Sequence, residues 1–241
     1  MAHNDLIGFG LLLGYFVAMG LPMILLKAFD KVPFEVARKL YHLVIALSIF
    51  PMLKLFSSWY AAVLAALALV LLVYPLLAAL ENTSVFERIA VEREGGEFKR
   101  SLIIIQLAII LLIVFSWGLL GADWKYIAAV AIMAWGFGDA AAALVGKAIG
   151  RKRIRHPRIE GAKTVEGTLA MLVVAGLAIF FTLLLYAGQT WQVSAAVALL
   201  VAPVGAAVEL FSRRGMDTLT VPLSVGASVL ALMLALSLAG I

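Results

Sequence analysis

Long apolar runs separated by short polar stretches dominate this chain. Eight of the runs are long enough to cross a bilayer, because a spanning helix needs about 20 mostly apolar residues. They lie near residues 6–28, 38–57, 59–80, 101–121, 124–146, 168–188, 190–211 and 218–240. Every backbone polar group in lipid needs a partner within the protein, so each run is predicted to be a helix. The second run is the weakest, because Pro51 and Lys54 interrupt it.

The composition agrees with this pattern. Of the 241 residues, 64% are hydrophobic and 14% are charged, whereas about 25% are charged in an ordinary soluble protein. A soluble domain of this length could not bury so much apolar surface. We therefore predict an all-α polytopic integral membrane protein that forms one transmembrane domain over residues 1–241, with no separate soluble domain. The absence of cysteine excludes disulfides and thiolate-ligated metals. The net charge of +5 does not indicate nucleic acid, and its placement is more informative.

Positive charges occur in every second polar stretch. The stretches that follow the first, third, fifth and seventh runs hold 17 of the 19 Lys and Arg residues, and the other side holds only Lys54 and Lys125. The positive-inside rule then places the basic stretches in the cytoplasm and both termini on the outer side. Trp residues at the predicted outer ends of four runs fit the aromatic belt of a membrane interface. The prediction is a cell (inner) membrane protein whose basic side faces the cytoplasm.

Asp139 lies inside the fifth apolar run, nearer its cytoplasmic end. A charge near the centre of a membrane helix costs at least about 2.5 kcal/mol, so such a carboxylate normally has a partner. A divalent cation is one candidate partner. Small residues around Asp139, among them Gly136, Gly138 and Ala140, allow neighbouring helices to approach closely. The alternative is a helix-packing face that contains one paired acid.

The sixth run opens on Lys163-Thr164-Val-Glu166-Gly167. Thr164 can cap the helix, and free N–H groups in a first helical turn form an anion site. Lys163 adds a point charge suited to phosphate. Taken alone, this segment favours the alternative, which is an ordinary capped helix behind a positively charged loop.

Two more acids, Glu209 and Asp217, are predicted to reach the same membrane face at the inner ends of the last two runs. Mg²⁺ takes oxygen ligands and is commonly shared with substrate phosphates. Four acids and many Lys and Arg residues on one face are what a Mg²⁺–nucleotide site needs. In the alternative interpretation, Arg213 and Arg214 simply neutralise acids as surface ion pairs.

The second run begins with Arg38-Lys39, and His42 follows four residues after Arg38, on the same helix face. In the alternative interpretation, the two bases set the membrane topology and His42 is a packing residue. The acidic and basic stretch 81–100 is predicted to be an amphipathic interfacial segment that Gly95 and Gly96 break. A solvated connector is favoured there over a lid or a lipid entrance.

Together these motifs resemble the CTP-dependent lipid-alcohol kinases, the family of dolichol kinase, phytol kinase and the CTP-dependent diacylglycerol kinases. The matching pieces run in order from about residue 36 to 225. They are Arg38-Lys39-x-x-His42, Gly138-Asp139-x-x-Ala142-x-x-x-Gly146-x-x-x-Gly150, Lys163-Thr164-x-Glu166-Gly167, Glu209 and Asp217-Thr-Leu-Thr-Val-Pro222. One departure is Thr218, which stands where the family has Asn.

The resemblance implies a transmembrane catalytic domain that transfers the γ-phosphoryl group of CTP to a polyprenol, phytol or diacylglycerol and releases CDP. Mg²⁺ is the implied cofactor, a membrane lipid and CTP are the implied partners, and a homodimer is left open. The implied metal ligands are Asp139, Glu166, Glu209 and Asp217. The implied nucleotide- and phosphate-binding residues are Arg38, Lys39, Lys147, Arg151, Lys163 and Thr164. The implied catalytic residues are Asp139, Glu166, Asp217 and His42, with Asp139 favoured as the general base.

Two other functions are compatible with parts of this pattern. The central motifs also resemble CDP-diacylglycerol synthases, which transfer a cytidylyl group to phosphatidate. Those synthases share a C-terminal stretch that contains His-Gly-Gly, and this chain has no histidine after His156. A lipid transporter or scramblase is the non-enzymatic alternative. Inverted repeats and paired broken helices would favour it, and the sequence shows neither by eye.

Overall fold

The computed structural model describes residues 3–81, 83–84, 86, 96–213 and 215–238, in which helices are joined by short loops and no strand occurs. The elements are α1 (His3–Ala28), α2 (Phe34–Leu47), α3 (Ile49–Leu55), α4 (Trp59–Leu80), α6 (Glu97–Ile113), the π-helix η1 (Val114–Leu119), the 3₁₀-helix η2 (Ala122–Trp124), α7 (Tyr126–Ile149), α8 (Val165–Phe181), the π-helix η3 (Thr182–Tyr186), α9 (Trp191–Phe211) and α10 (Asp217–Leu238).

These elements form eight helical spans that are long and apolar enough to cross a membrane. The prediction of an all-α protein with eight spans is therefore confirmed. The spans run over 3–28, 34–55, 59–80, 99–119, 122–149, 165–186, 191–211 and 217–238, within four residues of the predicted bounds. Large apolar side chains cover the outside of the bundle, and Leu71, Leu185 and Leu199 are each more than 70% exposed. An outer surface of this kind suits contact with lipid.

The second span is interrupted, as its sequence predicted. It consists of α2 and α3, which meet at Ser48. Pro51 has no backbone N–H, so the carbonyl of residue 47 loses its helical partner at this point. The hydroxyl of Ser48 donates to the carbonyl of Ile45 at 2.7 Å and satisfies one acceptor beside the break.

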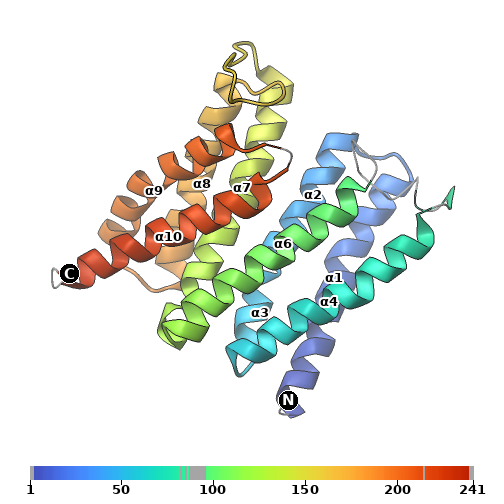
Figure 1. The fold of residues 1–241 in the computed structure, drawn as a ribbon, viewed down its shortest axis with the longest axis horizontal. Coiled ribbons are helices and arrows are strands. Elements are labelled where there is room, and N and C mark those ends of the chain that lie inside the picture. Colours follow the sequence, from blue (N-terminus) through green and yellow to red (C-terminus); the bar gives the residue numbers. More distant parts are fainter. Residues whose placement is uncertain (1–2, 82, 85, 87–95, 214, 239–241) are drawn as a thin grey trace.

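Helix α7 occupies the middle of the bundle. It packs against α8, α9 and α10 on one side and against α2, α3 and α6 on the other (Figure 1). It is also the most buried of the eight spans. Helices α1 and α4 lie further out, α1 against α2 and α3, and α4 against α6. Residues of α7 are therefore within reach of both halves of the bundle.

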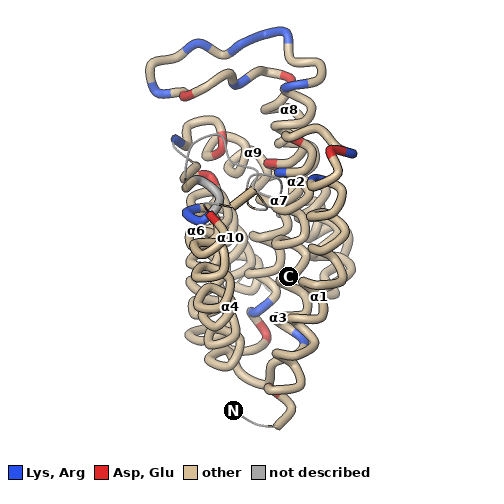
Figure 2. The backbone as a smooth tube through the Cα atoms, turned by 90° about the vertical axis from the view of Figure 1, so that its right-hand side faces the viewer, with Lys and Arg blue, Asp and Glu red and all other residues tan. Residues whose placement is uncertain are grey.

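Charged residues gather at one end of the bundle, from which the connection between α7 and α8 projects (Figure 2). The Trp residues at positions 59, 117, 124 and 191 belong to helix ends on the other side. Which of these ends faces the cytoplasm stays a prediction. Most of the stretch 81–100 lies outside the described residues, so its predicted role also stays open. Glu81 and Lys99, near its two ends, form an ion pair.

Glycine allows α7 to approach its neighbours closely. A Cβ atom on Gly136 would lie 2.3 Å from the Cβ of Ala46 in α2. A Cβ atom on Gly138 would lie 2.5 Å from the sulfur of Met171 in α8. Both distances are shorter than carbon–carbon or carbon–sulfur contacts allow. The predicted close packing around Asp139 is thus confirmed, and it brings α2 and α8 against the part of α7 that carries this acid.

Candidate active site

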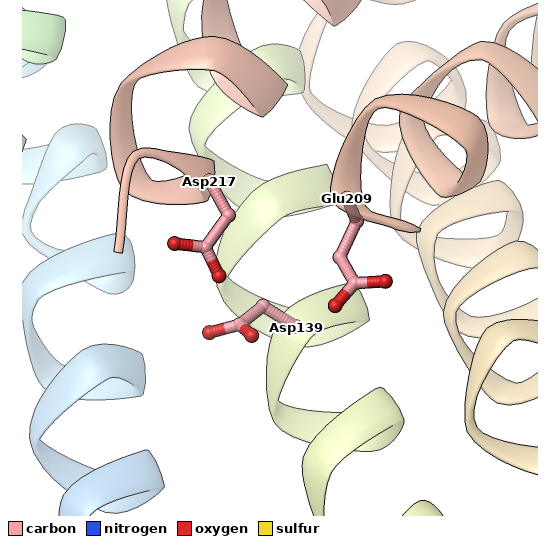
Figure 3. Close-up of side chains that lie close together, drawn as sticks. All are labelled: Asp139, Glu209 and Asp217. Atoms are coloured by element: carbon pink, nitrogen blue, oxygen red, sulfur yellow. The ribbon is translucent and has the colours of Figure 1, made fainter. Parts of the chain in front are cut away.

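Three carboxylates meet near the charged end of the bundle. Asp139 comes from α7, Glu209 from the last turn of α9 and Asp217 from the start of α10 (Figure 3). One oxygen of each lies within 4.8 Å of the other two. Asp139 and Glu209 are buried, and Asp217 is half-buried. Residues up to 78 positions apart in the sequence therefore form one acidic group, because α7, α9 and α10 pack together.

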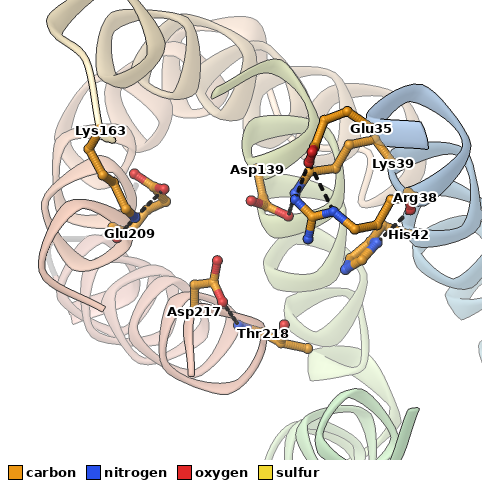
Figure 4. Close-up of polar contacts among 9 residues, drawn as sticks. All are labelled: Glu35, Arg38, Lys39, His42, Asp139, Lys163, Glu209, Asp217 and Thr218. Carbon is orange, nitrogen blue, oxygen red and sulfur yellow. Dashed lines mark hydrogen bonds and ion pairs between the residues drawn. The ribbon is translucent and has the colours of Figure 1, made fainter. Parts of the chain in front are cut away.

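Asp139 is paired with Lys39 of α2. The Nζ atom of Lys39 donates to Oδ2 of Asp139 at 2.5 Å (Figure 4). Lys39 is only 2% exposed, which is unusual for a lysine. A buried ammonium group needs a charged partner, because its desolvation costs several kcal/mol. Asp139 supplies that partner, and the pair joins α2 to α7.

Glu209 has a lysine of its own. The Nζ atom of Lys163, just before α8, donates to both the carboxylate and the backbone carbonyl of Glu209 at 2.5 Å each. Asp217 differs from the other two acids. It accepts a hydrogen bond from the backbone N–H of Thr218 at 3.0 Å, and within the described part of the chain it forms no ion pair.

The donor set of this acidic group fits Mg²⁺. All three side chains offer carboxylate oxygens, the ligands that hard cations prefer. Ligands of one Mg²⁺ lie about 2.0–2.1 Å from the ion, and hence at most about 4.2 Å from one another. Small rotations of side chains that already lie within 4.8 Å would bring the oxygens around one ion. The three acids and two lysines leave one net negative charge for a cation to compensate.

Arg38 lies beside this group on α2 and is held by Glu35. The carboxylate of Glu35 accepts a hydrogen bond from Nε of Arg38 at 2.9 Å, and a second from its terminal nitrogen (Figure 4). Glu35 is 6% exposed, so this pair is shielded from water. The sequence interpretation missed Glu35. The signal for it was an acid three positions before Arg38, at a spacing that places both residues on one helix face.

His42 lies one helical turn after Arg38. Its Nδ1 is 2.7 Å from the carbonyl oxygen of Arg38, and because a carbonyl only accepts, Nδ1 carries the proton. The imidazole packs against the indole of Trp135, with 5.4 Å between the ring centroids. These contacts agree with the packing interpretation. The catalytic role of His42 stays a prediction.

Thr164 caps α8, as predicted, and its hydroxyl accepts the N–H of Gly167 at 3.1 Å. The N–H of Val165 already donates to the carbonyl of Lys152 at 2.9 Å. At least two first-turn N–H groups are thus already bonded, and they form no open anion site. Glu166 faces the preceding loop and accepts the N–H of Lys152 at 3.3 Å. The structure therefore brings three of the four predicted metal ligands together and leaves Glu166 outside that group.

The remaining predicted bases lie in or near the projecting connection. Lys147 lies in the last turn of α7 and Arg151 near the start of the connection, and both side chains are exposed. Arg213 donates to the carbonyls of Pro157 and Arg158 at 2.7 and 3.1 Å. Its observed contacts therefore fix the position of the connection, whereas in the alternative interpretation of the sequence it neutralised the acids as a surface ion pair. Arg214, proposed for the same role, lies outside the described residues.

Comparison with known proteins gives one relevant similarity. A stretch of 96 residues is 41% identical to phytol kinase of Synechocystis sp., and this stretch covers 40% of the present chain and 40% of that protein. No protein-family model matches the chain, and no solved structure matches it. The eight spans make the chain an integral membrane protein, and the similarity relates it to a lipid kinase.

Proposed function

We propose that this protein transfers the γ-phosphoryl group of CTP to the hydroxyl group of a membrane lipid alcohol, such as a polyprenol, phytol or diacylglycerol, and releases CDP. The observation that carries the proposal is the group of Asp139, Glu209 and Asp217, flanked by two lysines, at the charged end of an apolar bundle. The similarity to a phytol kinase supports the reaction class.

In this proposal the three carboxylates hold Mg²⁺. The bound ion would neutralise the charge on the phosphate oxygens, which is the main requirement of phosphoryl transfer. Lys39 and Lys163 pair with two of the acids, Arg38 lies beside them in the part of the chain that the structure describes, and these three side chains bind the phosphates. Lys147 and Arg151, which are exposed nearby, add positive charge that attracts the nucleotide.

The lipid is bound by the spans themselves. The apolar outer surface accommodates the hydrocarbon tail, and the hydroxyl group reaches the carboxylates at the charged end. A carboxylate within about 3 Å of that hydroxyl accepts its proton, and Asp139 remains our candidate for this role. CTP is a cytoplasmic nucleotide, so we propose that the charged end faces the cytoplasm from the inner membrane.

The test is product analysis with purified protein, Mg²⁺ and γ-labelled CTP, across a panel of isoprenols and diacylglycerol. We expect labelled lipid phosphate and free CDP from at least one alcohol. The Asp139→Asn variant should lose this activity. The Asp123→Asn variant is the matched control, because Asp123 is exposed in η2 at the opposite end and should leave the activity unchanged. No labelled lipid from any alcohol, or release of pyrophosphate instead of CDP, would overturn the proposal.

A further inference from the structure

Two of the three acids in the proposed metal site are already bound to lysines. Lys39 lies 2.5 Å from a carboxylate oxygen of Asp139, and Lys163 lies 2.5 Å from one of Glu209. A metal ion at these oxygens would sit about 2.1 Å from them. The ammonium groups and the ion would then be a few ångströms apart, in a poorly hydrated site where like charges repel strongly.

With Mg²⁺ bound, the site would lack one negative charge. Three carboxylates balance three of the four positive charges that Mg²⁺ and two ammonium groups would bring. The excess would be buried, because Lys39 and Asp139 are 2% and 5% exposed, and a buried uncompensated charge is costly. Phosphate oxygens supply the missing negative charge. They are also acceptors to which a lysine can turn when it leaves its carboxylate.

We propose that Lys39 and Lys163 are internal counter-ions that compete with the divalent cation for Asp139 and Glu209, and that nucleotide phosphates free these carboxylates by binding the lysines. This proposal rests on the proposed function, because the lysines need a phosphate-bearing ligand to release them. The site then binds the cation weakly when no nucleotide is present. It binds the cation tightly when a nucleotide is bound as well. Coupling between two ligands is reciprocal, so the cation strengthens nucleotide binding by the same factor.

The two lysines are unequal as probes. Lys39 is almost fully buried, so its removal leaves Asp139 as an unpaired buried charge and endangers folding. The side chain of Lys163 is 20% exposed and stands before α8, where a substitution is tolerated more easily. Lys163→Met is therefore the variant used in the experiment, and Lys163→Gln repeats the measurement with a polar neutral side chain.

The experiment measures Mn²⁺ binding to the full chain in detergent, from the electron paramagnetic resonance signal of free Mn²⁺, with and without CDP. Parallel titrations of CDP without protein correct for its own Mn²⁺ binding. We expect CDP to tighten Mn²⁺ binding to the unmodified protein at least tenfold. The Lys163→Met variant should bind Mn²⁺ alone about tenfold more tightly than the unmodified protein, and CDP should then tighten binding less than in the unmodified protein, because only Lys39 remains to be released.

The control is Lys54→Met, which removes an exposed lysine of α3 at the opposite end of the bundle and should leave both affinities unchanged. Equal or weaker Mn²⁺ binding by both Lys163 variants without CDP would overturn the competition. If this result is found while phosphoryl transfer is intact, it contradicts only the competition between the lysines and the cation. If CDP still tightens Mn²⁺ binding as expected but no alcohol is phosphorylated, the proposed reaction is contradicted and the competition between lysines and cation is supported.

Discussion

Gly136 of α7 lies directly against Ala46 of α2, at a point where a Cβ atom on the glycine would be 2.3 Å from the Cβ of the alanine. This contact sets the separation of the two helices. Toward the charged end, one turn further along α7 and two turns further along α2, the same two helices bring Lys39 and Asp139 together at 2.5 Å. The ion pair thus depends on the absence of a side chain at position 136.

We expect Gly136→Ala to push α2 away from α7. Overpacking of this kind costs about 1–3 kcal/mol of stability, and it should also lower phosphoryl transfer by moving Lys39 away from the proposed phosphate site. Gly14→Ala is the matched control, because a Cβ atom there meets nothing within 4 Å. The double variant Gly136→Ala/Ala46→Gly moves the methyl group to the other helix and should recover most of the loss. Thermal unfolding in detergent and the labelled-lipid assay measure both effects, and a double variant no better than Gly136→Ala alone would contradict this account.

The buried pair of Lys39 and Asp139 leads to a second prediction. Removal of one partner from a buried pair costs about 3–5 kcal/mol, because the other charge is left uncompensated. Lys39→Met should therefore destabilise the protein by that amount. Lys39→Met/Asp139→Asn removes both charges and should be clearly more stable than Lys39→Met, although it should not transfer phosphate. Denaturant unfolding of the two variants in the same detergent checks this, and a double variant no more stable than Lys39→Met would rule out the coupling.

Glu35 is predicted to position Arg38 for the nucleotide. Hydrogen bonds to charged groups contribute about 1.5–3 kcal/mol, and Glu35→Gln weakens those that orient the guanidinium. We expect the KM for CTP to rise about tenfold while kcat falls less. Glu35→Asp keeps the charge and should restore part of the affinity. Steady-state kinetics over a range of CTP concentrations provide the measurement, and equal KM values for Glu35→Gln and the unmodified protein would exclude a positioning role.

The sequence was sufficient to predict the spans and to name three acids that the structure brings together, although metal binding by these acids stays a prediction. Run length located the helices, and the break near Pro51 was visible because proline removes a backbone donor. Asp139 was identified because an acid in an apolar run is costly. The alternation of charge placed Glu209 and Asp217 on the same side of the membrane, and the structure brings both to Asp139.

The sequence did not predict which individual side chains contact one another. Nothing in the motifs distinguished Glu166, which bonds to the loop backbone, from Glu209, which reaches the acidic group. Both are acids at the charged ends of helices, and the direction of each side chain depends on how α8 and α9 rotate against α7. The identity of the lysine partners was hidden for the same reason, because Lys39 and Asp139 are 100 positions apart.

The orientation of the bundle gives the last prediction. The chain contains no cysteine, so a single introduced cysteine is an unambiguous probe. Arg153→Cys places a thiol in the exposed connection between α7 and α8, and Ala122→Cys places one at an exposed position of η2 on the other side. The positive-inside rule predicts that a membrane-impermeant maleimide added to intact cells labels Ala122→Cys and leaves Arg153→Cys unlabelled. In inside-out vesicles the pattern should reverse. Labelling of Arg153→Cys in intact cells would place the carboxylates on the side away from cytoplasmic CTP, and the proposed reaction would then lack its phosphoryl donor.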